Sequence, residues 1–94
     1  MTPEGAVKRE VKKVLKEYKA YYHMPVQNGM GAPTLDFVGC YNGRFFAIET
    51  KAPGKKPTPR QEVTVALIKA AGGEAFVIDG DTGGLRQWLR DHAV

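Results

Sequence analysis

The sequence predicts an α/β domain in which a small mixed β-sheet is flanked by helices. Apolar residues recur at helical spacing near the start of the chain, at Val7, Val11 and Val14. Further along, Asn42-Gly43 between two apolar runs predicts a β-hairpin. The expected order is helix, three strands, helix, strand, helix. Three consecutive strands favour an antiparallel meander, and the helical crossover favours a parallel partner for the last strand.

The length and composition of the chain limit what the protein can be. Its 94 residues predict a single domain over residues 1–94, with a core thin enough to favour oligomerisation. The net charge of +4 and the pI of about 9.3 favour a polyanionic partner. One cysteine cannot form an internal disulfide, and two histidines argue against a Cys/His zinc site. No apolar run approaches the roughly 18 residues of a membrane helix, and no signal peptide is evident, so we expect a soluble intracellular protein.

The first helix is expected to begin at Thr2, whose hydroxyl can cap it, with Pro3 at the first helical position. Lysines, among them Lys8 and Lys12, cover its polar surface, where they either keep the helix soluble or contact phosphates. Glu4 falls on the apolar side, where it either complements the helix dipole or reaches the end of a packed sheet. The expected buried stripe consists of Val7, Val11, Val14, Leu15 and Tyr18.

A strand is expected over residues 20–27. Pro25 argues for an edge or terminal position, because proline lacks the N–H donor of a sheet ladder. His23 is favoured as a locally hydrogen-bonded side chain over a catalytic one. The glycines and proline of residues 28–33 then predict a loop that leads directly to Asp36.

The strongest functional signal lies in residues 35–52, which predict the two strands of the hairpin. A two-residue turn fixes the register, so Asp36 is expected to face Glu49. Facing like charges destabilise a hairpin, whereas a divalent cation such as Mg²⁺ or Mn²⁺ would bridge them. Lys51 points to the same face as Glu49 and could hold a phosphate or a nucleophilic water. The competing interpretation is a set of solvated strand side chains, and a bulge would shift the register by one residue.

A turn-rich basic loop follows over residues 53–60 and carries Lys55, Lys56 and Arg60. Because this loop begins immediately after Lys51, its charges are expected near the predicted metal site. We favour phosphate contacts for these residues, and a solubilised loop is the alternative.

The second helix is expected to begin at Thr58, with Pro59 at its first position and Gln61 placed to close a capping box. Gly72-Gly73 ends it. Its apolar packing is expected from Val65, Leu67, Ile68 and Ala71.

The last two elements are a strand over residues 74–79 and a closing helix. The nearly continuous apolar run from Phe76 to Ile78 predicts an inner strand covered on both faces. A loop over residues 80–84 separates this strand from the helix. That helix is indicated by Leu85, Trp88 and Leu89.

The arrangement of these motifs resembles the PD-(D/E)XK nuclease superfamily, and it is most similar to the VRR-NUC (virus-type replication-repair nuclease) branch. The similarity lies in an N-terminal helix with an acid, Gly-x-x-x-x-Asp before a hairpin, the segment Phe46-Ala-Ile-Glu-Thr-Lys-Ala-Pro, and Thr58-Pro-Arg-Gln. It extends over residues 2 to about 79 and implies an αβββαβ, restriction-endonuclease-like core. One departure is Leu35, which stands where the family often has a proline directly before its aspartate.

The resemblance implies a set of metal ligands. Asp36 and Glu49 are similar to the metal-binding carboxylates of the family, and the main-chain carbonyl of Thr50 is similar to its main-chain ligand. Glu4 is similar to the helix acid that completes the metal site, with Glu10 as the alternative.

The same resemblance implies the activity. Lys51 resembles the lysine that orients or activates the attacking water, and Gln61 resembles the glutamine beside it. The implied protein is a Mg²⁺- or Mn²⁺-dependent endonuclease of a bacterial or phage-infected cell's cytoplasm. It would cleave branched DNA, such as four-way (Holliday) junctions, as a homodimer. Contacts to flanking phosphates are expected from Lys8, Lys12, Lys55, Lys56 and Arg60.

Two other functions stay open from the sequence. The chain could be a non-catalytic nucleic-acid-binding module with a nuclease fold, although the intact set of Asp36, Glu49 and Lys51 argues against this. It could also be a subunit that cleaves only with a DNA-processing partner protein. Cleavage by the isolated protein separates both alternatives from the nuclease.

Overall fold

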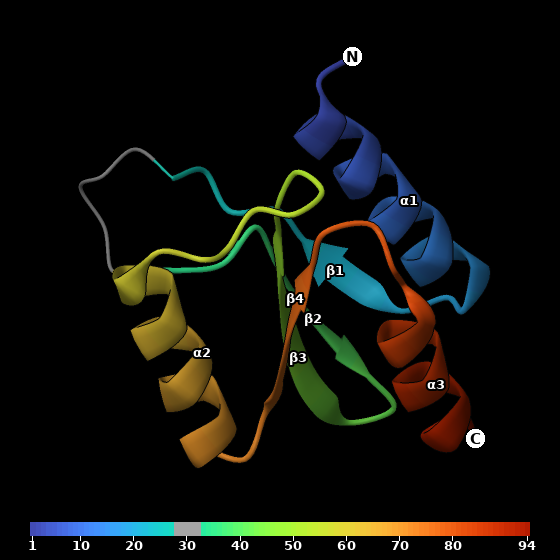
Figure 1. Cartoon of the computed structure of the whole chain (residues 1–94). Coiled ribbons are helices and arrows are strands. Elements are labelled where there is room, and N and C mark those ends of the chain that lie inside the picture. Colours follow the sequence, from blue (N-terminus) through green and yellow to red (C-terminus); the bar gives the residue numbers. More distant parts are fainter. Residues whose placement is uncertain (28–32) are drawn as a thin grey trace.

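The structure, a computed structural model, describes residues 1–27 and 33–94, which form one mixed sheet with helices on both faces (Figure 1). The predicted α/β fold class is confirmed. Most of the predicted loop over residues 28–33 lies outside the described residues. The elements are α1 (Pro3–Glu17), β1 (Tyr21–His23), β2 (Phe37–Tyr41), β3 (Arg44–Thr50), α2 (Pro59–Ala70), β4 (Glu74–Ile78) and α3 (Gly83–Asp91).

The strands lie in the order β1-β2-β3-β4 across the sheet. β2 pairs antiparallel with β1 and β3, and β4 pairs parallel with β3 after the crossover through α2. The predicted meander and the predicted parallel partner are therefore both confirmed. α2 covers one face of the sheet, and α1 and α3 cover the other (Figure 1).

The β2–β3 hairpin has the turn that its sequence dictates. Asn42 and Gly43 have positive φ angles of 49° and 82°, as a type I′ turn requires. From this turn the ladder runs in the predicted register as far as the pair Phe37–Ile48. The pairing stops there, so Asp36 lies one residue beyond the ladder.

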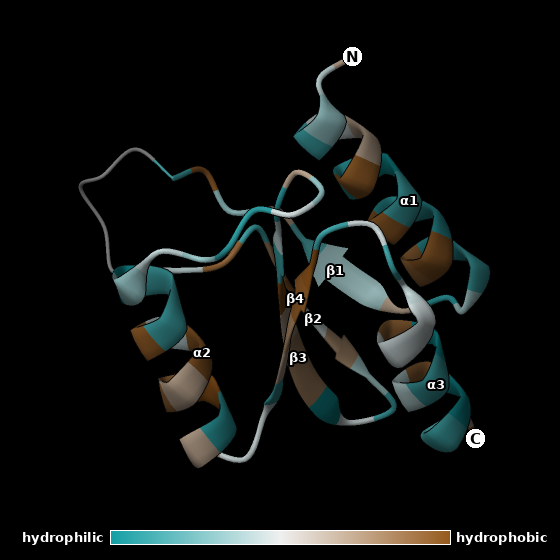
Figure 2. Cartoon of the chain, in the orientation of Figure 1, coloured by the Kyte–Doolittle hydropathy of each residue, from teal (hydrophilic) through white to brown (hydrophobic). Residues whose placement is uncertain are grey.

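Two unequal hydrophobic clusters hold the helices against the sheet, and Figure 2 shows the apolar positions of the helices and strands in brown. The smaller cluster lies between the sheet and α2, where Leu35, Ala47 and Ala75 are buried and Val65 and Ile68 pack against them. The larger cluster lies under α1 and α3, and it confirms the predicted stripe of α1. Its buried members are Val7, Val11, Val14, Leu15, Phe37, Tyr41, Phe46, Ile48, Ile78, Leu85 and Leu89.

The two edge strands differ from their predicted form. β1 spans Tyr21–His23 rather than residues 20–27, because Pro25 has no N–H to continue a ladder. Its predicted edge position is confirmed. The prediction that β4 is an inner strand is wrong, since β4 forms the opposite edge and Val77 is 41% exposed. The apolar run of β4 has another cause: the strand packs on α2 on one side and on Trp88 of α3 on the other.

The first two helices begin at their predicted caps, Thr2 and Thr58. In α2, however, Leu67 is 66% exposed rather than packed, and none of the residues of this fully described helix is buried. α3 begins at Gly83, inside the predicted loop over residues 80–84. None of the described helices is both long and apolar enough to cross a membrane.

Candidate active site

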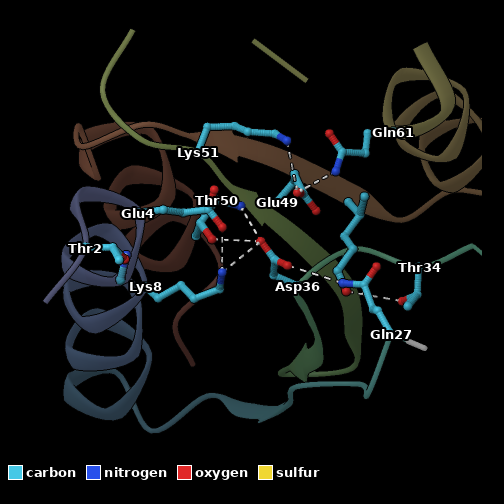
Figure 3. Close-up of polar contacts among 12 residues, drawn as sticks. Thr2, Glu4, Lys8, Gln27, Thr34, Asp36, Glu49, Thr50, Lys51 and Gln61 are labelled. Carbon is cyan, nitrogen blue, oxygen red and sulfur yellow. Dashed lines mark hydrogen bonds and ion pairs between the residues drawn. The ribbon is translucent and has the colours of Figure 1, made fainter. Parts of the chain in front are cut away.

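Four segments converge at one end of the sheet (Figures 1 and 3). They are the residues before β2, the end of β3, and the first turns of α1 and α2. This convergence brings together residues that are up to 57 positions apart in the sequence. They are the predicted catalytic residues, Glu4, Asp36, Glu49, Lys51 and Gln61.

Asp36 is held by hydrogen bonds from backbone and side chains. Its Oδ2 accepts from the amide N of Thr50 at 2.9 Å and from the Thr50 hydroxyl at 2.7 Å, and its Oδ1 accepts from Nε2 of Gln27 at 3.2 Å. The regular alternation of strand residues breaks here, because Leu35 is buried on the α2 face whereas Phe37 lies in the cluster under α1 and α3. Asp36 therefore anchors to the end of β3 instead of extending the expected ladder.

Glu49 is buried next to it, with only 3% of its surface exposed. Its Oε2 accepts from Nε2 of Gln61 at 2.9 Å and lies 3.7 Å from Nζ of Lys51. Its Oε1 is buried and accepts no hydrogen bond from any residue that the structure describes. Burial, and after it the nearby charge of Asp36, raises the pKa of Glu49 to about 7. The charge of Lys51 lowers this pKa but does not outweigh the other two effects. A further positive charge beside Oε1 would therefore be stabilising.

The side chain of Gln61 both caps α2 and contacts a carboxylate of the site. Its Oε1 accepts from the amide N of Thr58 at 2.9 Å, which completes the predicted capping box of α2. Because the amide oxygen is used there, the NH₂ group points the other way, and Nε2 donates to Glu49. The capping role and the site role that the sequence predicted belong to one side chain.

Lys51 directly follows β3 and lies beside Glu49, as their spacing predicts. Its backbone N–H donates to the carbonyl of Ile78 at 2.9 Å, which extends the parallel pairing by one residue. Beyond it, Oδ2 of Asp79 accepts from the amide N of Gly54 at 3.3 Å and ties the basic loop to the end of β4. The Lys51 side chain is 14% exposed, so its ammonium is mostly buried at the site.

The first turns of α1 bring a carboxylate and an ammonium to the site. Oε2 of Glu4 accepts from Nζ of Lys8 at 2.7 Å, and the same Nζ lies 3.9 Å from Oδ2 of Asp36. Burial lowers the pKa of Lys8, but the hydrogen bond to Glu4 and the charge of Asp36 outweigh burial and raise it overall. Glu10 is exposed, so of the two candidate helix acids it is Glu4 that lies at the site.

These residues fit a divalent cation without forming a complete cage. In the described parts of the chain, no group of three or more Asp, Glu, His or Cys side chains is placed to hold a metal ion. Mg²⁺, however, is usually bound by one or two carboxylates, and waters and phosphate oxygens complete its octahedron. Asp36 and Glu49 supply two such carboxylates, and Oε1 of Glu49 has no partner within the described residues that an ion would displace. The Thr50 carbonyl and Glu4 stay predicted ligands.

The predicted phosphate-binding residues fall into two groups. Lys55, Lys56 and Arg60 are exposed after β3 and at the start of α2, and they form no ion pair over residues 1–27 and 33–94. Lys12 lines a groove of about 620 Å³ along α1. Lys8 lies in the same groove, but its amino group is already engaged by carboxylates of the site.

Comparison with known proteins identifies the fold. No model of a protein family matches the sequence, and no curated protein matches it. A solved structure described as "VRR_NUC domain" matches with a TM-score of 0.75 and 20% sequence identity, over 100% of both chains. The chain has the VRR_NUC fold. At this identity the likeness shows the arrangement of helices and strands, which agrees with the fold implied by the sequence motifs.

Within the VRR_NUC fold, three contacts of the site differ from or add to what the sequence predicted. Thr50, predicted to act through its carbonyl, holds Asp36 with its amide and its hydroxyl. Gln27 donates to the same carboxylate. Lys8, predicted to contact DNA, pairs with Glu4. Only this last pair has a sequence signal, the i,i+4 spacing of opposite charges on a helix.

Proposed function

We propose that the protein is a metal-dependent nuclease that hydrolyses phosphodiester bonds in DNA. The observation that carries the proposal is the buried Oε1 of Glu49, which has no hydrogen-bond partner in the described part of the chain. Burial, and after it the nearby charge of Asp36, raises the pKa of this carboxylate. A bound cation would offset the charge that burial makes unfavourable. The VRR_NUC fold and the net charge of +4 support a nucleic-acid substrate.

Asp36 and Glu49 would hold the ion, Mg²⁺ or Mn²⁺, with the Thr50 carbonyl and Glu4 as further ligands. When bound, such an ion polarises a phosphate and lowers the pKa of a coordinated water. The hydrogen bonds from Thr50 orient Asp36, and the amide of Gln61 orients Glu49. Both carboxylates are therefore set in place before a substrate arrives, which lowers the entropic cost of reaching the reactive geometry.

Lys51 would supply the remaining positive charge of the reaction. Its ammonium is mostly buried at 3.7 Å from Glu49, where it can orient the attacking water and offset negative charge that develops on the phosphate. The exposed Lys55, Lys56 and Arg60 would bind flanking phosphates, which gives affinity without base readout.

The substrate that we propose is branched DNA, such as a four-way junction, cleaved by a homodimer. The resemblance to standalone VRR-NUC nucleases supports this substrate, and a symmetric dimer would present two sites to two strands. The thin core of a 94-residue chain also favours association. Action on DNA would place the protein in the cytoplasm of a bacterial or phage-infected cell.

The test is cleavage of a labelled four-way junction beside matched linear duplex and single strands, with Mg²⁺ or Mn²⁺. Wild type is compared with Lys51→Ala and Asp36→Ala. Junction cleavage that requires the metal and both residues supports the proposal. Cleavage retained by Asp36→Ala contradicts the proposed metal site. Binding without cleavage under both metals favours a non-catalytic module or a subunit that depends on a partner protein.

A further inference from the structure

Lys8 belongs to two parts of the molecule at once. Its Nζ donates to Oε2 of Glu4 at 2.7 Å and lies 3.9 Å from Oδ2 of Asp36. Figure 3 shows this ammonium between the two carboxylates, on the α1 side of the site. The Lys8 side chain is 30% exposed, so it borders solvent as well as the carboxylates.

The same lysine lines the groove of about 620 Å³ along α1. The positive residues of this groove repeat every three or four positions, so they form one stripe along the helix. At 1.5 Å per residue, the stripe extends about 12 Å, which is long enough to meet more than one phosphate of a DNA strand. Its members are Lys8, Arg9, Lys12, Lys13 and Lys16.

We infer that Lys8 is shared between the metal site and this groove: its ammonium pairs with Glu4 and Asp36 when the metal is absent, and binds a DNA phosphate when the metal is present. The inference rests on the proposed function. A divalent cation beside Asp36 repels the ammonium, and a strand lying along the stripe offers it a phosphate instead. Lys8 is then a positioning residue that couples metal binding to DNA binding.

The charges are close enough for this coupling to be measured. Near a protein surface, unit charges 3.9 Å apart interact strongly enough to change a dissociation constant by at least roughly tenfold. The coupling is reciprocal, so Lys8 weakens metal binding by the same factor by which the metal weakens the pairing of Lys8 with the carboxylates. Metal and DNA are therefore expected to bind with positive cooperativity through this side chain.

The first test measures Mg²⁺ affinity by isothermal titration calorimetry without DNA. Lys8→Met removes the ammonium and keeps an unbranched side chain, and we expect it to bind Mg²⁺ roughly tenfold more tightly than wild type. The matched control is Lys12→Met, which removes a charge from the same groove one turn along the helix and should keep the wild-type affinity. An unchanged Mg²⁺ affinity in Lys8→Met would overturn the inference.

The second test measures DNA affinity with and without Mg²⁺ in the Lys51→Ala background, in which cleavage is slow enough for binding to be measured. Addition of Mg²⁺ should raise DNA affinity several-fold more in Lys51→Ala than in Lys51→Ala/Lys8→Met. In the same background, Lys12→Met should weaken DNA binding by a similar factor with and without Mg²⁺. An equal Mg²⁺ effect with and without Lys8 would contradict the coupling.

Reductive methylation of wild type, followed by mass spectrometry, needs no variant. We expect modification of Lys8 to rise several-fold when Mg²⁺ is added, while modification of Lys12 stays constant. A wild type that binds no Mg²⁺ would remove the metal site and the proposed function together. Mg²⁺ binding that leaves the Lys8 amine equally protected would overturn the role of Lys8 alone.

Discussion

On the α1 side of the site, Asp36 receives hydrogen bonds from the amide and hydroxyl of Thr50 and from Gln27, and the ammonium of Lys8 lies 3.9 Å away. On the α2 side, one oxygen of Glu49 accepts a hydrogen bond from Gln61 and lies 3.7 Å from the ammonium of Lys51, whereas its other oxygen has no partner among the residues that are described. The two carboxylates belong to one site, and each has an ammonium within 4 Å. The fold nevertheless gives hydrogen-bond donors to both oxygens of Asp36 and leaves one buried oxygen of Glu49 without a partner in the described residues.

The difference shows where the fold tolerates an electrostatic cost. The donors to Asp36 fix a carboxylate that stays stable without metal. Glu49 is almost fully buried and has a pKa of about 7, so ionisation there opposes folding until a cation arrives. A neutral residue in place of Glu49 would serve stability better, which makes Glu49 the position where function and stability conflict.

Removal of the ammonium beside Glu49 is expected to have the largest effect. Lys51→Ala should lower the rate of metal-dependent cleavage by about 10²- to 10³-fold, because a charge aimed at the transition state is lost. Circular dichroism should show the fold retained. The control is Lys55→Ala, an exposed lysine four residues on, which should only weaken DNA binding. An equal loss of rate in both variants would contradict the assignment of Lys51 to the chemistry.

The pH dependence of stability tests the cost of Glu49 itself. Its pKa is raised from 4.5 to about 7 in the folded chain, so the folded state holds the proton more tightly than the unfolded state. The stability that the protonated form contributes is fully present below about pH 4.5 and is lost as the pH rises through about 7. In metal-free buffer at about pH 8 the loss is roughly 3 kcal/mol.

Glu49→Gln should therefore be more stable than wild type at about pH 8, as measured by urea unfolding with a chelator present, and should also lose metal-dependent cleavage. Glu10→Gln, which changes an exposed acid of α1, is the control and should keep the wild-type pH profile. A wild-type stability that stays flat between about pH 5 and pH 8 would be inconsistent with the raised pKa.

A smaller effect is expected on the α1 side, where Thr50→Val removes the hydroxyl that donates to Asp36 and preserves the side-chain shape. Hydrogen bonds to charged groups contribute about 1.5–3 kcal/mol, so we expect the free energy of unfolding to fall by about 1.5 kcal/mol. Mg²⁺ binding should weaken several-fold. Thr50→Ser keeps the hydroxyl and should retain the wild-type Mg²⁺ affinity; the same affinity in both variants would sink this role for the hydroxyl.

The smallest change in stability is expected at Gln61. Gln61→Ala removes the closing bond of the capping box and the donor to Glu49, and should cost about 1 kcal/mol in thermal or urea unfolding. Gln61→Glu keeps an acceptor for the amide of Thr58 but brings a second negative charge to Glu49. The pH at which stability is lost should then move upward, and an unmoved pH would show that Gln61 does not act on Glu49.

Local signals in the sequence are sufficient to predict the hairpin and the starts of the first two helices. A type I′ turn admits one pairing, so Asn42-Gly43 fixes the hairpin register. The spacing of Glu49 and Lys51, two residues apart, places them on one face. The capping threonines and the prolines that follow them fix where α1 and α2 begin. Asp36, Glu49 and Lys51 can therefore be named as site residues before the fold is seen.

The remainder depends on how distant segments pack. The apolar run of β4 is the same in an inner strand and in an edge strand with helices on both faces. The turn of the chain at Leu35, which moves Asp36 out of the ladder, has no signature in the residue pattern. In the sequence, Lys8 cannot be told from the other lysines of α1. Only the packing of α1 against the sheet places its ammonium beside Asp36.

Anomalous scattering from crystals soaked in Mn²⁺ tests the proposed metal site most directly. In wild type we predict a peak between Asp36 and Glu49, within coordinating distance of Oε1 of Glu49. In Glu49→Gln we predict that this peak is absent. Wild-type crystals without a peak there at saturating Mn²⁺, or an equally strong peak in Glu49→Gln, would contradict a metal centre built on these two carboxylates.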